Sequence, residues 1–228
     1  MTLQQNDKVS NKSADPFETG DAWRQFLSLE SSMKEFVDYV PLDRRNRHVF
    51  SPKLGTILIS AATQVEATFK AIIKSNYVDG DTTVNQRQLK AARKAIQKGK
   101  SNLQHYRAVL EPYFLLSKRR VTIGQYPTVY RRTYPFRQFR IERAPVWWER
   151  YNLVKHSYYD NIKQATLRTT FSALVALFLI QVMHLTHRKT LVDMGVIKSG
   201  HKDLQIPGLT RGALKELVSS SPRQIPGC

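Results

Sequence analysis

The chain has 228 residues, a length typical of one domain with appendages and sufficient to bury a sizeable core. Its 36 Lys and Arg against 18 Asp and Glu leave a net charge of +18. Such a charge favours a polyanion, either nucleic acid or an anionic membrane surface, over a solvated surface without a partner. The single cysteine, Cys228, excludes an intrachain disulfide and a cysteine-based zinc site.

The amino-terminal part begins with a polar segment, and two helices are expected after it. Residues 1–20 show no apolar signal segment and are expected to be disordered. Apolar residues then recur at spacings of three and four, which predicts a helix over 21–40. A second helix is expected over 53–75, with Ser51 as its N-cap and Pro52 at its first position.

The middle of the chain begins with a basic helix and continues as an irregular connection. A third helix is expected over 84–110, where it carries seven cations and is weakened by Gly99. Residues 111–145 contain several prolines and alternate aromatic side chains with arginines. This composition predicts a long basic connection with room for a short β-hairpin.

The carboxyl-terminal part is expected to supply the central helix. Helices are predicted over 146–158 and 161–187, and the second is apolar nearly all round, so it should be the longest and most buried. A membrane span is the alternative for this apolar stretch. One short helix is expected over 210–218. We therefore predict an all-α antiparallel bundle over 21–188, followed by an extension over 189–228.

The positive charge is concentrated in the middle third of the chain. Between Thr82 and Arg150, 16 Lys and Arg against three Glu leave +13 of the total +18. The segment 113–148 also holds nine large aromatic residues, which either stack on unpaired bases or pack inward as core. The combination favours single-stranded or looped RNA over a rigid duplex. The residues expected to bind RNA are Arg119, Arg120, Arg131, Arg132, Arg137 and Arg140.

The segment 147–158, WWERYNLVKHSY, carries residue types that support proton transfer. Arg150 and His156 lie six residues apart on nearby but not identical helix faces, whereas Asn152 and His156 share one face. A neutral imidazole can act as a general base. The alternative is a histidine that is satisfied within a helix interface.

This segment resembles the HEPN superfamily, a group of helical nucleotide-binding domains. In its active members an Arg is followed, after four to six residues, by a His and often by a Tyr two residues further on. Arg150, His156 and Tyr158 match that pattern. The similarity to bacterial HEPN-like proteins covers roughly 35–75 and 145–185. A register with four intervening residues would instead put Tyr151 at the position of the Arg.

The resemblance implies an HEPN-like bundle that acts on RNA, as a metal-independent endoribonuclease in a toxin or phage-defence role. Arg150 and His156 would be catalytic, with Asn152, Lys155 and Tyr158 assisting. The His would take the proton of a ribose 2′-OH, and the Arg would stabilise the phosphate. A homodimer, a cytoplasmic location, no cofactor and no membrane contact are expected. The alternative is an HEPN-like module that binds RNA or a protein without cleavage.

Two further histidines, His184 and His187, lie three residues apart, a spacing that a metal site can use. Asp193 is the one additional ligand type nearby. The pair is therefore expected to be structural, and no metal is predicted.

Overall fold

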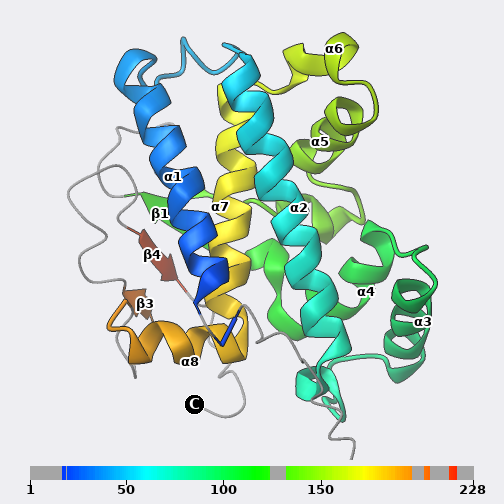
Figure 1. The fold of residues 1–228 in the computed structure, drawn as a ribbon. Helices are drawn as coiled ribbons and strands as arrows, with labels where there is room; N and C mark the ends of the chain where they lie inside the picture. Colours follow the sequence, from blue (N-terminus) through cyan, green and yellow to red (C-terminus); the bar gives the residue numbers. More distant parts are fainter. Residues whose placement is uncertain (1–16, 19, 124–131, 197–202, 206–215, 220–228) are drawn as a thin grey trace, which may run out of the picture.

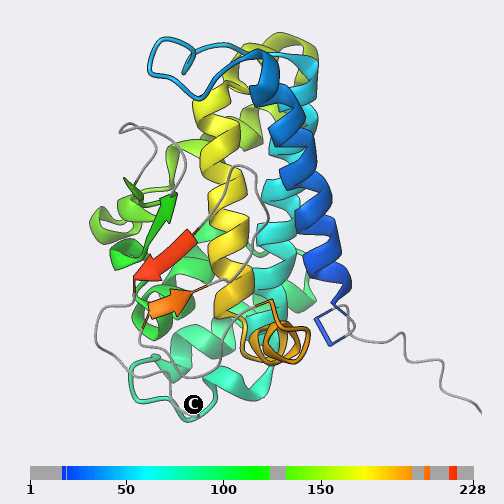
Figure 2. The ribbon, with the colours of Figure 1, turned by 90° about the vertical axis from the view of Figure 1, so that its left-hand side faces the viewer.

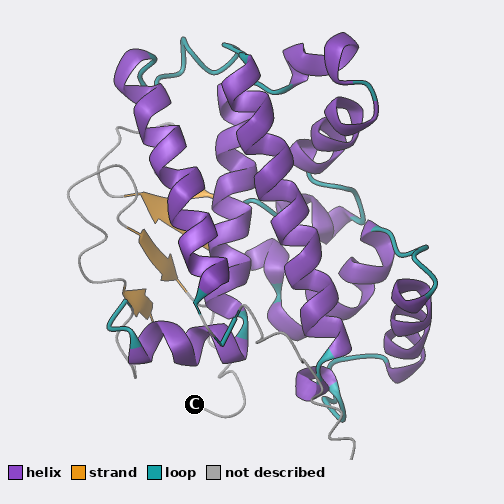
Figure 3. Cartoon of the chain, viewed as in Figure 1, coloured by secondary structure: helices purple, strands orange, loops and turns teal. Residues whose placement is uncertain are grey.

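The computed structural model describes residues 17–18, 20–123, 132–196, 203–205 and 216–219 (Figure 1). This part of the chain is mostly helical, which confirms the all-α class (Figure 3). Its α-helices are α1 Asp21–Tyr39, α2 Pro52–Lys74, α3 Gln86–Gln97, α4 Leu103–Phe114, α5 Val146–His156, α6 Tyr158–Asn161, α7 Leu167–Met183 and α8 Leu185–Asp193.

The first two helices form where the apolar spacing predicts them. Helix α2 begins as expected, because the Ser51 hydroxyl accepts a hydrogen bond from the Leu54 N–H at 3.2 Å and Pro52 occupies the first position. Glycine at position 55 lets α6 approach this helix closely. A Cβ there would lie 2.6 Å from Cδ1 of Ile162 and 3.2 Å from the hydroxyl of Tyr158.

Helix α7 is the centre of the core, and all but two of its residues are buried. It packs against α1, α2 and α5 (Figures 1 and 2). Two buried polar side chains connect it to its neighbours. The Thr170 hydroxyl donates to the Leu54 carbonyl at 3.2 Å, and the Gln181 amide donates to the Ala22 carbonyl at 3.0 Å.

The expectation that one helix over 161–187 would be the longest is wrong. Helix α7 has 17 residues, whereas α2 has 23. Thr166 starts α7 by accepting from the Thr169 N–H. At the other end the chain turns through 84° at His184 into α8.

The single helix expected over 84–110 is also a wrong prediction, because the structure has two helices there. Helix α3 ends at Gln97, and Gly99 adopts the left-handed conformation with φ +65°. Asn102 then caps α4 in a capping box with His105. Glycine does more than weaken the middle of one helix, because its left-handed backbone redirects the chain.

A small sheet lies on one side of α7 (Figure 2). Strand β1 pairs antiparallel with β2, as the predicted hairpin requires, and also with β4, giving the order β2-β1-β4-β3. The prediction of a helix over 210–218 is wrong for residues 216–218, because they lie in the strand β4. Residues 210–215 lie outside the described part of the chain. The strands are β1 Arg120–Ile123, β2 Arg132–Thr133, β3 Asp203–Gln205 and β4 Glu216–Ser219.

Both predicted domain boundaries are crossed by contacts in the structure. Phe17, in the expected amino-terminal tail, is buried and stacks on His184 with ring centroids 4.1 Å apart. Helix α8 runs through the boundary at 188, and β4 pairs with β1.

One helix of the described residues, α2, is long and apolar enough to cross a membrane. Half of its apolar 18-residue stretch is buried in the bundle. Helices α7 and α8 are long and apolar enough to cross a membrane only if the two bent helices together form one span. Helices buried in this way are typical of the core of a soluble protein.

Candidate nucleic-acid interface

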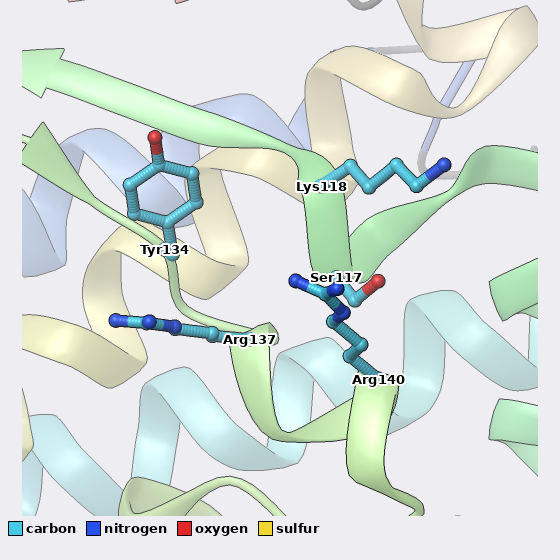
Figure 4. A pocket seen from close by; sticks show the side chains of 5 residues that line it. All are labelled: Ser117, Lys118, Tyr134, Arg137 and Arg140. Atoms are coloured by element: carbon cyan, nitrogen blue, oxygen red, sulfur yellow. The ribbon is translucent and has the colours of Figure 1, made fainter.

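A pocket of about 720 Å³ opens between two short 3₁₀ turns, η2 (Leu116–Lys118) and η3 (Arg137–Ile141). Among the described residues, three cations, one serine and one tyrosine line it, and no acid does. Figure 4 shows Tyr134 above Arg137, with the guanidinium of Arg140 reaching toward Ser117. The lining residues are Ser117, Lys118, Tyr134, Arg137 and Arg140.

The η2 side of the pocket is held in place by the end of α4. Leu115 adopts a left-handed conformation that ends the helix and turns the chain into η2. Glu111 then accepts hydrogen bonds from the N–H and the hydroxyl of Ser117, at 2.9 and 2.5 Å. These bonds fix the position of Ser117 at the pocket wall.

The η3 side is positioned by the segment FRQFR, residues 136–140, in which Phe and Arg each recur after three residues. A 3₁₀ helix has about three residues per turn, so residues three apart lie one above the other. Phe136 and Phe139 are buried, and Arg137 and Arg140 are exposed. The indole N–H of Trp147 anchors the start of this turn by donating to the Pro135 carbonyl at 2.8 Å.

The described residues neutralise only part of the charge of the pocket cations, since the Glu111 carboxylate interacts electrostatically with Lys118. Within the described residues, Lys118, Arg137 and Arg140 form no side-chain hydrogen bond or ion pair. The nearby Glu142 lies 3.6 Å from the guanidinium of Arg107 instead. A concave surface with uncompensated positive charge attracts anions and concentrates them locally.

The six arginines expected to bind RNA have different positions in the structure. Arg137 and Arg140 line the pocket, and Arg120 is half-buried at the start of β1. Arg132 begins β2, and Arg131 lies outside the described residues.

Arg119 corrects the expectation of a surface contact, because only 4% of this residue is exposed. Its Nε donates to the Phe114 carbonyl at 2.8 Å, and burial lowers the pKa of the guanidinium while Glu111 raises it. Arg119 therefore stabilises the turn beneath the pocket. Sequence reasoning missed Ser117, and it counted Lys118 and Tyr134 in the basic aromatic segment without assigning them to the site. The FRQFR repeat could have indicated the η3 side of the pocket.

Most aromatic residues of the middle third pack inward as core, which was the alternative to stacking on unpaired bases. One ring, Tyr134, is 39% exposed at the pocket, whereas Tyr126 and Tyr130 lie outside the described residues. Tyr113 is half-buried. The buried ones are Phe114, Phe136, Phe139, Trp147 and Trp148.

One cation of the basic segment 84–110 has a structural role. The Arg93 guanidinium donates to the carbonyls of Ile73 and Ser75, at 2.7 and 2.6 Å, and lies 2.7 Å from Asp79. Arg93 therefore binds the last carbonyls of α2.

The predicted catalytic residues lie on and just after α5, and none of them is among the residues that line the pocket. His156 and Lys155 are exposed at the end of this helix, and Arg150 and Asn152 are half-buried. The Lys155 ammonium lies 5.3 Å from the centroid of the Tyr151 ring. Tyr151 is fully buried, so in the alternative register the Arg position falls in the core.

Helix geometry separates Arg150 from His156 within one chain. Six residues correspond to about 9 Å along the axis and about 120° around it. Tyr158 lies beyond the helix end, where its half-buried side chain donates to the Pro52 carbonyl at 3.4 Å. The structure thus places His156 in solvent but does not bring Arg150 beside it.

The paired histidines have structural contacts. Both are buried, and Nδ1 of His184 accepts the His187 N–H at 3.3 Å, so His184 caps α8. Phe17 covers His184. Among the described residues, no three His, Cys, Asp or Glu side chains gather as metal ligands.

Comparisons with known protein families, with curated proteins and with solved structures found no match to this chain.

Proposed function

We propose that this chain binds single-stranded RNA through the pocket between η2 and η3. The observation that carries the proposal is the set of three cations, Lys118, Arg137 and Arg140, around a concave site whose described lining contains no acid. Its volume of about 720 Å³ lies in the range of small-ligand pockets and suits one nucleotide unit of a strand.

Each side chain of the pocket has a counterpart in an RNA strand. Guanidinium groups donate two parallel hydrogen bonds to phosphate oxygens, and an ammonium adds a point charge. The partly exposed Tyr134 ring offers a stacking face, worth about 1–3 kcal/mol per base. Because a duplex hides its base faces, unpaired RNA fits this arrangement best.

The proposal includes an HEPN-like identity and a cytoplasmic location. The mostly helical architecture and the Arg150, His156 and Tyr158 spacing support the first. Burial of the apolar helices in the bundle supports the second.

The test is fluorescence anisotropy with a labelled single-stranded RNA, titrated at several salt concentrations. Arg137→Glu/Arg140→Glu should weaken binding at least about tenfold, which corresponds to about 1.4 kcal/mol. It should also flatten the dependence of affinity on salt, because fewer counterions are released. The matched control is Lys74→Glu/Lys189→Glu, which makes the same change of net charge at exposed lysines of α2 and α8. An equal loss of affinity in both variants would show that the pocket contributes only nonspecific positive charge, and it would contradict the proposal.

Endoribonuclease activity is the second candidate, and the exposed ring of His156 favours it. Because Arg150 of the same chain lies on a different helix face, its role would require a second copy in a homodimer. Asn152, Lys155 and Tyr158 would assist, and the biological role would be that of a toxin or a phage-defence protein.

The nuclease candidate has a complementation test. The parent protein should cleave RNA in the presence of EDTA. His156→Ala and Arg150→Ala should each abolish this cleavage. The control is Lys189→Ala, which removes an exposed cation of α8. Mixing the two inactive variants should restore part of the activity, since a mixed dimer would contain one intact site. Full cleavage by His156→Ala would eliminate this candidate.

A further inference from the structure

A second cationic surface with exposed aromatic rings lies at one end of the bundle, and it is separate from the pocket lining. We call it the bundle-end surface. It is formed by the connection between α1 and α2, by the segment from α6 to the start of α7, and by the first turn of α7 (Figure 1). Its residues are Arg44, Arg47, Phe50, Tyr159, Lys163 and Arg168.

Backbone pairing brings these distant segments together. Phe50 and Thr166 form an antiparallel bridge. The Leu167 N–H donates to the Val49 carbonyl at 2.8 Å, and the Arg168 N–H donates to the Arg47 carbonyl at 3.2 Å. The two arginines therefore belong to one paired strip of backbone, although they are more than a hundred residues apart in sequence.

Helix α6 is fixed beside this strip. The Tyr158 hydroxyl donates to the Pro52 carbonyl, and Ile162 packs on the bare backbone of Gly55. These contacts hold Tyr159 on the outside of the bundle, where 93% of it is exposed. Phe50 is 51% exposed. Large aromatic residues with this exposure beside cations are typical of surfaces that bind a partner.

The electrostatics of the bundle-end surface favour an anion. Helices α2 and α7 both begin here, so their positive dipole ends add to the four cations (Figure 1). Two acids of the same segments have partners of their own. Asp43 accepts from Arg45, and Asp160 accepts from the Ser157 hydroxyl.

We infer that the bundle-end surface is a second RNA contact, in which Tyr159 and Phe50 stack on unpaired bases and the arginines bind the phosphates. This inference rests on the proposed function, since it takes RNA as the ligand. Helix α5 connects the η3 segment at the pocket to α6 at the bundle end, and it is about 16 Å long. An RNA strand that contacts both surfaces must therefore contain more than one nucleotide. Two linked contacts on one strand raise the affinity of long RNA above that of short RNA.

The experiment compares oligouridines of about 4 and about 16 nucleotides, the range that single-strand-binding modules cover. Phe50→Ala/Tyr159→Ala should weaken binding of the longer RNA about tenfold and leave the shorter one unchanged. Leu27→Ala/Met194→Ala is the control, because these apolar residues are exposed elsewhere. Arg44→Glu/Arg168→Glu should reproduce the loss and reduce the dependence of affinity on salt.

The outcomes separate this inference from the proposed function. Unchanged affinity of Phe50→Ala/Tyr159→Ala for the longer RNA, with a loss in the pocket variant, overturns the bundle-end contact alone. No binding of either RNA by the parent protein overturns both. Binding of the parent to phosphatidylserine vesicles that the bundle-end variants lose, without a loss of RNA binding, would identify a membrane contact and also overturn the inference.

Discussion

Glu111 holds Ser117 through two hydrogen bonds, from the backbone N–H at 2.9 Å and from the hydroxyl at 2.5 Å. Because the carboxylate belongs to α4 and the serine to η2, this pair attaches one wall of the pocket to the helical bundle. Burial raises the pKa of the Glu111 carboxyl, while the bonds from Ser117 lower it.

Ser117→Ala should reduce the free energy of unfolding by about 1–3 kcal/mol, because a partly buried carboxylate loses a donor. Urea denaturation measures the loss. The control is Ser32→Ala on α1, whose hydroxyl donates to the carbonyl of Ser28 within the same helix, and it should change the stability by less than about 0.5 kcal/mol. Equal stability of Ser117→Ala and the parent would show that the pair does not support the turn.

Gly55→Ala should destabilise the contact between α2 and α6. The new Cβ would lie 2.6 Å from Cδ1 of Ile162, and such overpacking costs about 1–3 kcal/mol, partly offset by the helix propensity of alanine. Ile162→Val removes that Cδ1. In a double-mutant cycle the pair Gly55→Ala/Ile162→Val should therefore recover part of the stability. Additive losses would contradict the close approach.

Gly99→Ala should cost about 1–2 kcal/mol, because residue 99 is left-handed with φ +65°. Helix content, measured by circular dichroism, should not rise, since Asn102 starts a separate helix. Gln97→Ala, at the last position of α3, is the control and should be close to neutral. A gain in both helix content and stability would indicate one continuous helix instead.

Glu30→Gln should change how stability depends on pH. Burial is the main reason that the pKa of Glu30 is raised from 4.5, although Lys34 opposes this. The folded state thus binds the proton more tightly than the unfolded state. The resulting stability is present below the ordinary pKa and is lost as pH rises through the raised value.

Because glutamine does not titrate, the Tm of the variant relative to the parent should become more positive from pH 4.5 to pH 7. Asp43→Asn is the control, since hydrogen bonds from Arg45 lower the pKa of Asp43 from 3.8 and its titration lies below this range. A constant difference for Glu30→Gln over the same range would show that the carboxyl is not perturbed.

Part of the site was predictable from the sequence, and part was not. The charge of the middle third pointed to the region of Arg137 and Arg140, but it could not separate them from Arg119, which is buried. Composition reports how many cations a segment carries. Their exposure depends on which side of each turn packs against the core.

What the sequence by itself determined is local. The spacing of apolar residues predicted α1 and α2, and the Ser51-Pro52 start predicted the cap, because these signals act within one or two turns. Only the tertiary structure decided the pairing of β1 with β4, the stacking of Phe17 on His184 and the meeting of η2 with η3. These features join residues that are distant in sequence, and such contacts form when the packed core brings the segments together.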